Sequence, residues 1–191
     1  LGAADLDGDG LKDVLVGNPA RKQADDAVGA VHLVPATRLN SLPREPFVSG
    51  KMPSVEHLFK DPASPGVYSL FGTTAEGEFG KAIAAVPLLG GQGRDAIVIG
   101  SPQSDVGGVA KTGGAFIFRH RPDGAGFDPT PMAIISGETY RKGGSLGDNV
   151  DATLLDGVPT VVVAGSNGTP YASDELVDNG TVYTFQFPIA D

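Results

Sequence analysis

The sequence predicts an all-β protein, and three observations support this fold class. Glycine and proline are frequent, with 28 and 15 residues among 191, yet hydrophobic residues still make up 40%. This combination favours many short strands joined by tight turns over long helices or disorder. A strand–turn–strand pattern also occurs three times along the chain. Finally, no apolar run reaches the roughly 20 residues that a membrane helix needs, so we expect no direct membrane insertion.

Each copy of this pattern has the same three parts. An apolar, β-branched run ends at glycine, a polar loop follows, and glycine then opens a second alternating strand. These are the signals of a β-hairpin with a buried inner strand. The paired segments are 13–19 with 29–34, 95–102 with 114–118, and 161–167 with 180–185.

A second recurring element precedes two of the hairpins. Phe79-Gly80 stands before residues 81–86, and Leu146-Gly147 stands before residues 148–153. We expect the first copy to lack this element, because the chain starts too late to contain it. The run of small residues in 82–85 suits a crowded position where the innermost strands of a β-propeller converge. An ordinary β-sandwich with glycine turns is the alternative.

The chain therefore divides into one partial unit, an insert and two further units, as part of one β-propeller domain built from four-stranded antiparallel blades. Six prolines and weak periodicity mark the insert, which we expect to be an outer strand and loop with one short helical turn around 54–59. The expected bounds are 1–34 for the end of a blade, 35–70 for the insert, 71–121 for the second unit and 122–191 for a third, degenerate unit.

An acidic loop between the first strands predicts a Ca²⁺ site. The carboxylates of Asp5, Asp7, Asp9 and Asp13 alternate so that they can converge on one hard cation, and the order of the loop assigns a backbone carbonyl to Leu11. Gly8 and Gly10 permit the positive-φ backbone that wraps an ion. A solvated acidic turn without a metal is the alternative.

The start of this loop matches an EF-hand, but the rest does not. An EF-hand needs a bidentate Glu at loop position 12, where this sequence has Val16 inside an apolar strand. Aligning Asp95 with Asp13 puts Pro87, Leu89 and Gly91 at the other acidic positions, and Val161 replaces the last Asp in the third unit. One site and two degenerate ones predict a structural role for calcium.

These motifs resemble the FG-GAP repeats of integrin α-subunit propellers and their relatives. The resemblance rests on Phe79-Gly80, on the hairpins ending in 17–19 and 100–102, and on the acidic loop. It implies propeller blades in a ring of typically seven, of which this chain would supply about two and a half. Missing sequence, another chain or a symmetry mate would then complete the ring.

The sequence predicts no catalytic residues and no cofactor besides Ca²⁺. The three histidines are isolated, and we expect His32 to face outward on its strand and His120 to lie at a solvated strand end. No serine lies in a Gly-x-Ser-x-Gly elbow. The net charge of −9 disfavours nucleic acid, because phosphate binding needs clustered lysine and arginine.

Two classes of function follow. The first is a non-catalytic, calcium-stabilised module that binds protein or glycan outside the cell or at its surface, as in cell adhesion. The second is the scaffold of a secreted hydrolase or lyase whose catalytic residues lie outside this chain. Extracellular placement follows from the millimolar calcium found there. Asn167 and Asn179 open N-glycosylation sequons, which matter only in a eukaryotic secreted glycoprotein.

Overall fold

A computed structural model describes residues 1–40, 67–86, 95–121, 126–136, 145–166 and 180–186. These residues form three antiparallel sheets and one small hairpin, with a single short helix among them. The described part contains no helix with the length and apolar character that crossing a membrane requires. The prediction of an all-β chain is confirmed.

The first sheet has four strands in the order β1–β2–β5–β6. Each strand pairs with its neighbour in antiparallel register. A small hairpin, β3–β4, leaves the sheet between β2 and β5, and helix α1 follows β5. The bounds are β1 Gly2–Ala4, β2 Asp13–Asn18, β3 Lys22–Gln23, β4 Asp26–Ala27, β5 Ala30–Val34, α1 Ala36–Asn40 and β6 Tyr68–Phe71.

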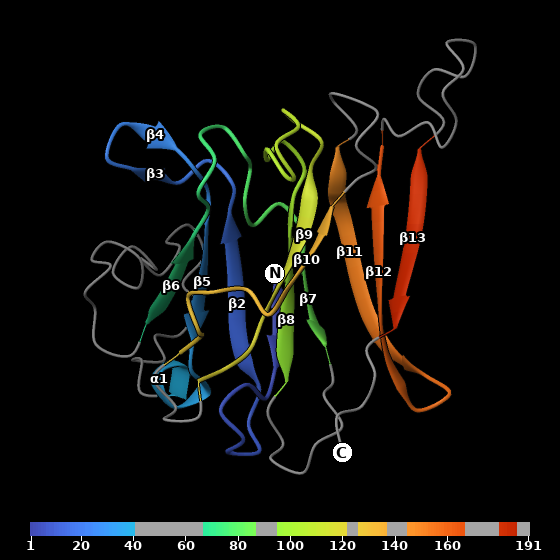
Figure 1. Cartoon of the computed structure of the whole chain (residues 1–191). Helices are drawn as coiled ribbons and strands as arrows, with labels where there is room; N and C mark the ends of the chain where they lie inside the picture. Colours follow the sequence, from blue (N-terminus) through green and yellow to red (C-terminus); the bar gives the residue numbers. More distant parts are fainter. Residues whose placement is uncertain (41–66, 87–94, 122–125, 137–144, 167–179, 187–191) are drawn as a thin grey trace, which may run out of the picture.

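The second sheet repeats this arrangement, and the third repeats its first three strands within the described residues. Figure 1 shows the three sheets side by side, in the order in which they occur along the chain. The first strands of the three sheets lie next to one another, since β1 and β11 both contact β7; convergence around a propeller axis stays a prediction. The bounds are β7 Ile83–Val86, β8 Ala96–Ser101, β9 Gly114–Phe118 and β10 Ala133–Ser136, then β11 Leu146–Leu155, β12 Val158–Gly165 and β13 Thr181–Gln186.

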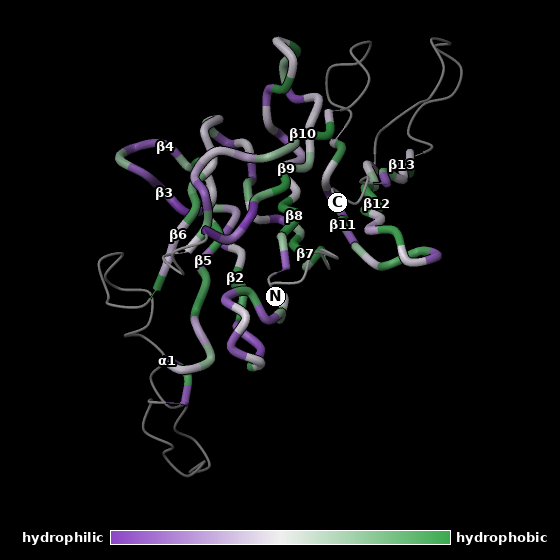
Figure 2. Tube along the Cα trace, turned by 60° about the horizontal axis from the view of Figure 1, so that its bottom comes forward, coloured by the Kyte–Doolittle hydropathy of each residue, from purple (hydrophilic) through white to green (hydrophobic). Residues whose placement is uncertain are grey.

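Two hydrophobic cores lie between the sheets, and the second sheet contributes to both. Because side chains alternate across a strand, Ile97 and Ile99 of β8 pack toward the first sheet while Ala96 and Val98 pack toward the third. All four are fully buried. Figure 2 shows the hydrophobic segments along the central strands, and hydrophilic ones in the β3–β4 hairpin. The uninterrupted apolar run in β8 thus follows from burial on both faces.

Repeated glycines let the backbones of successive sheets touch. A Cβ on Gly17 would lie 2.1 Å from the carbonyl oxygen of Gly80, and one on Gly100 would lie 2.0 Å from that of Gly147. Parallel bridges join Gly29 to Phe79 and Gly113 to Leu146 beside these contacts. The glycines that end the first two hairpin runs, Gly17 and Gly100, are therefore required by the approach of the next sheet.

Phe79, the aromatic member of the Phe-Gly pair, closes the first core. Its side chain is 3% exposed. It makes edge-on contacts with Phe116 and Phe118, with ring centroids 5.9 and 6.0 Å apart. Leu146 holds the corresponding place in the second core. The Phe-Gly motif thus combines a buried apolar side chain with a close backbone contact.

Strand pairing corrects the expected unit bounds. β6 is the outer strand expected within 35–70, and it extends one residue further to Phe71, whereas β10 pairs with β9, so residues 133–136 belong to the second unit rather than the third. The first unit also has an innermost strand, β1, contrary to expectation. The hairpin signal missed β1 and β10 because they are only three and four residues long. The helical turn expected around 54–59 lies outside the described residues.

Candidate metal centre

The acidic loop joins β1 to β2 and is anchored in the core between the first two sheets. Leu6, directly between Asp5 and Asp7, is fully buried there together with Ala4. The residues from Gly8 to Lys12 are exposed. One apolar side chain therefore pins the start of the loop while the rest projects into solvent.

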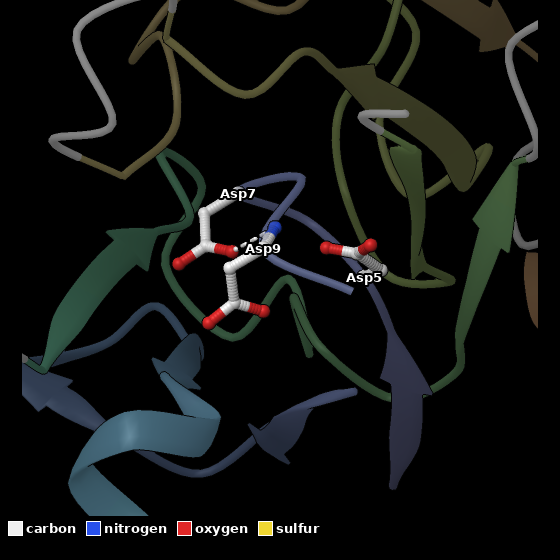
Figure 3. A group of neighbouring side chains, drawn as sticks. All are labelled: Asp5, Asp7 and Asp9. Carbon is white, nitrogen blue, oxygen red and sulfur yellow. Dashed lines mark hydrogen bonds between the residues drawn. The ribbon is translucent and has the colours of Figure 1, made fainter. Parts of the chain in front are cut away.

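Three carboxylates of the loop come together. Oxygen atoms of Asp5, Asp7 and Asp9 all lie within 4.8 Å of one another. Figure 3 shows the Asp5 carboxylate directed toward the other two. These are three of the five ligands that the sequence predicts.

Backbone hydrogen bonds hold the loop in this shape. The two oxygens of Asp5 accept from Gly8 N at 2.8 Å and Gly10 N at 3.0 Å. Asp7 accepts from Asp9 N at 3.1 Å, and Asp9 accepts from Leu11 N at 2.8 Å. Both glycines have positive φ, 79° and 84°, which suits residues without a Cβ.

Asp13 is placed differently from the other three aspartates. It is 1% exposed, and its two oxygens accept from Leu6 N at 3.0 Å and Ala36 N at 2.9 Å. Burial raises the pKa of its carboxyl; the two hydrogen bonds lower it, and the charges of Asp7 and Asp9 raise it. Asp13 thus ties the start of the loop, at Leu6, to α1, and it does not join the three-carboxylate cluster.

The fifth predicted ligand, Leu11, lies on the solvent side of the loop. Its side chain is 45% exposed, and its backbone N donates to Asp9. An exposed leucine contributes nothing to the core, so its position is consistent with a residue whose role is carried by its backbone. The ligand role of its carbonyl oxygen stays a prediction.

The donor set suits a hard cation. Three close carboxylates repel one another in the absence of a positive charge. They offer only oxygen ligands, which Ca²⁺ prefers, whereas zinc is also bound by nitrogen and sulfur ligands. Among the described residues, Asp5, Asp7 and Asp9 are the one group of three or more His, Cys, Asp or Glu side chains that lie close enough together to hold a metal ion. The residues present therefore fit a calcium ion.

Asp95 lies beside this loop, although the alignment of the repeats puts it at the position of Asp13 in the second unit. Its backbone N donates to the Asp5 carbonyl oxygen at 3.3 Å. Burial raises the pKa of its carboxyl and the charge of Asp5 raises it further, while Lys12 lowers it. In the sheets Asp13 pairs with Ala4 and Ala96 with Val86, so Ala96 is the true equivalent of Asp13.

The third unit has no loop at the corresponding place. Asp156 and Gly157, both with positive φ, form a tight two-residue turn between β11 and β12. An Asp-Gly pair between two alternating segments is a strong sequence signal for a β-hairpin, so the sequence of residues 150–162 already predicts this turn. The corresponding residues 87–94 of the second unit lie outside the described part.

A cavity of about 200 Å³ adjoins the acidic loop. Most of the residues around it belong to the first sheet and helix α1, and His120 comes from the segment between β9 and β10. Its lining residues are Asp7, Asp13, Leu33, Pro35, Thr37, Tyr68 and His120.

Two histidines are buried, contrary to expectation. His32 is 6% exposed and its Nδ1 lies 2.8 Å from Ser69 Oγ, on the first sheet's face away from the second. His120 is 8% exposed, with Nδ1 3.0 Å from the Arg121 carbonyl oxygen and its ring edge-on to Phe127. Alternation correctly indicated a strand but could not show what covers each face. The sequons at Asn167 and Asn179 lie outside the described residues.

Comparison with known families supports the repeat assignment. The model of the FG-GAP repeat family matches residues 1–34. This segment contains β1, the acidic loop, β2 and β5, which are the elements described above. Residues 1–34 are thus similar to an FG-GAP repeat. FG-GAP repeats build integrin-like β-propellers, and the three adjacent sheets are consistent with a segment of one. No curated protein matches the chain.

Proposed function

We propose that this chain is part of a calcium-stabilised β-propeller, a non-catalytic module that binds a protein or glycan ligand outside the cell or at its surface. The convergence of Asp5, Asp7 and Asp9 carries the calcium part of this proposal. FG-GAP repeats occur in extracellular and surface proteins, where millimolar calcium can fill a site of moderate affinity.

Calcium would act on the fold rather than on a substrate. The loop joins two strands of the FG-GAP repeat, and Leu6 within it is part of the core between two sheets. An ion that cancels repulsion among the three carboxylates would hold the loop, and therefore Leu6, in place. Ligand binding would then fall to surfaces that the rigid sheets present.

Further repeats are expected to pack beside the third sheet. Along β13 the outward residues alternate with partly buried ones, and Val182 is 66% exposed. Leu155, at the end of β11, is 52% exposed. Exposed apolar side chains on a sheet that has a core on its other face are typical of a surface that another unit covers.

Calcium titration of the thermal unfolding transition tests the metal site. An ion present at 100 times its Kd stabilises the fold by about 2.7 kcal/mol, which corresponds to roughly 5–10 °C in Tm for a chain of this size. We expect EDTA to remove this gain. The double variant Asp7→Asn/Asp9→Asn should abolish the response to calcium.

The matched control is Asp25→Asn/Asp26→Asn, which removes the same charge from the β3–β4 hairpin at the other end of the sheet (Figure 1). It should keep the full calcium response. An unsubstituted chain whose Tm is the same in EDTA and in millimolar calcium would show that the carboxylates do not form a calcium site.

A further inference from the structure

The loop of the FG-GAP repeat is in contact with the second sheet through its backbone. Asp95 immediately precedes β8, whose residues from Ala96 to Ser101 are all buried. Its N–H donates to the carbonyl oxygen of Asp5, the first carboxylate residue of the loop. Because β8 fixes Asp95, this hydrogen bond links the start of the loop to a rigid element of the neighbouring sheet.

The next residue of the loop, Leu6, is connected to β8 through the hydrophobic core between the two sheets. Leu6 is fully buried in the core that also contains Ile97 of β8. Asp5 therefore accepts a hydrogen bond from the segment that begins at Asp95, and Leu6 belongs to the same hydrophobic core as that segment. A change in the loop's conformation has to be accommodated at the junction of the two sheets.

The negative charges of Asp5 and Asp95 oppose the contact between the loop and the second sheet. The Asp5 carboxylate acts unfavourably on the Asp95 carboxyl, which burial partly withdraws from water, and Lys12 supplies an opposing charge. The three-carboxylate cluster carries a charge of −3 when ionised, and a bound Ca²⁺ would reduce it to −1. The ion would thus relieve repulsion on Asp95 as well as within the loop.

We propose that Asp95 is a positioning residue of the calcium site, through which binding of the ion in the first sheet tightens its contact with the second. This inference rests on the proposed calcium site. Asp95 attracts the ion electrostatically and anchors Asp5 by its N–H, without being one of the ligands. Calcium at this site therefore acts as a clamp between two blades rather than only within one.

Asp95→Asn in the 191-residue chain tests the electrostatic part, because asparagine keeps the backbone N–H and removes the charge. Isothermal titration with CaCl₂ in low salt should give a Kd about three- to tenfold weaker than that of the unsubstituted chain. The difference should shrink in roughly 0.5 M KCl, where screening is strong. In EDTA the variant should be at least as stable as the unsubstituted chain.

The control Asp26→Asn has the same net charge and lies at the opposite end of the sheet (Figure 1). It should change the Kd by less than about twofold. Equal affinities for the two variants, or a loss at Asp95 that is unaffected by salt, would overturn the role of the Asp95 charge. Failure of the unsubstituted chain to bind calcium would overturn the metal site itself, and would be seen before any variant is measured.

Hydrogen exchange tests the clamp. Calcium should slow exchange of the Asp95 amide in the unsubstituted chain, because the ion fixes the Asp5 carbonyl that accepts from it. Protection confined to the loop and β2, with Asp95 unchanged, would overturn transmission to the second sheet while leaving calcium binding intact.

Discussion

Gly100→Ala is the sharpest test of how the sheets fit together. Gly100 lies in β8, and a Cβ added to it would be 2.0 Å from the carbonyl oxygen of Gly147 and 3.0 Å from the carbonyl carbon. Both neighbours are backbone atoms of the adjacent sheet, so no side-chain rotation can relieve the clash. The backbone of Gly100 needs no positive φ, so the contact alone decides the outcome.

The expected destabilisation is large. A carbon and an oxygen in ordinary contact lie well over 3 Å apart, so the second and third sheets must separate by about 1 Å at this point. Separation on that scale forfeits a quarter to a half of the dispersion energy of the atom pairs involved. Overpacking costs typically 1–3 kcal/mol and more where nothing can yield, so we expect about 3–5 kcal/mol. In a chain of this size that lowers the Tm by about 10 °C.

Thermal and urea unfolding, followed by far-UV circular dichroism, measure this effect. Gly2→Ala is the matched control, because its Cβ would meet only side-chain atoms at 3.6 Å or more. It changes the same residue type in a strand of the first sheet and should alter the Tm by less than about 3 °C. If the two variants unfold at the same temperature, backbone contact between sheets is not what requires glycine at Gly100.

Two further predictions concern side chains between and on the sheets. Phe79→Ala should lower the free energy of unfolding, measured in urea, by about 3–5 kcal/mol, because it leaves a cavity beside Phe116 and Phe118. Phe79→Leu should lower it by less, since Leu146 occupies the equivalent place in the second core. Equal losses of stability in the two variants would contradict this. Burial, and then the charge of Arg21, lower the pKa of His32 below its ordinary 6.5. The folded state therefore binds this proton less tightly than the unfolded chain, so stability should be full above pH 6.5 and fall as the pH drops below it. His32→Gln should flatten that part of the stability–pH curve, and an unchanged slope would show that another group is responsible.

The sequence by itself determined the all-β class, the hairpins and the acidic loop. These features are local: alternation of apolar residues specifies strands, glycine specifies turns, and aspartates two residues apart can converge without help from the rest of the fold. The Phe-Gly pairs were also visible. Their physical meaning, a buried ring beside a backbone contact between sheets, was not.

Only the tertiary structure decided which segments meet. The short strands β6 and β10 carry too few residues to show a period, and their hydrogen-bond partners lie in other parts of the chain. Burial of His32 depends on packing around its sheet, which alternation cannot report. Asp95 stands far from the loop in sequence, and an alignment one residue out of register put it in an equivalent position in another sheet. Its place beside Asp5 arises because consecutive sheets stack face to face, which brings the start of β8 against the loop of the preceding sheet.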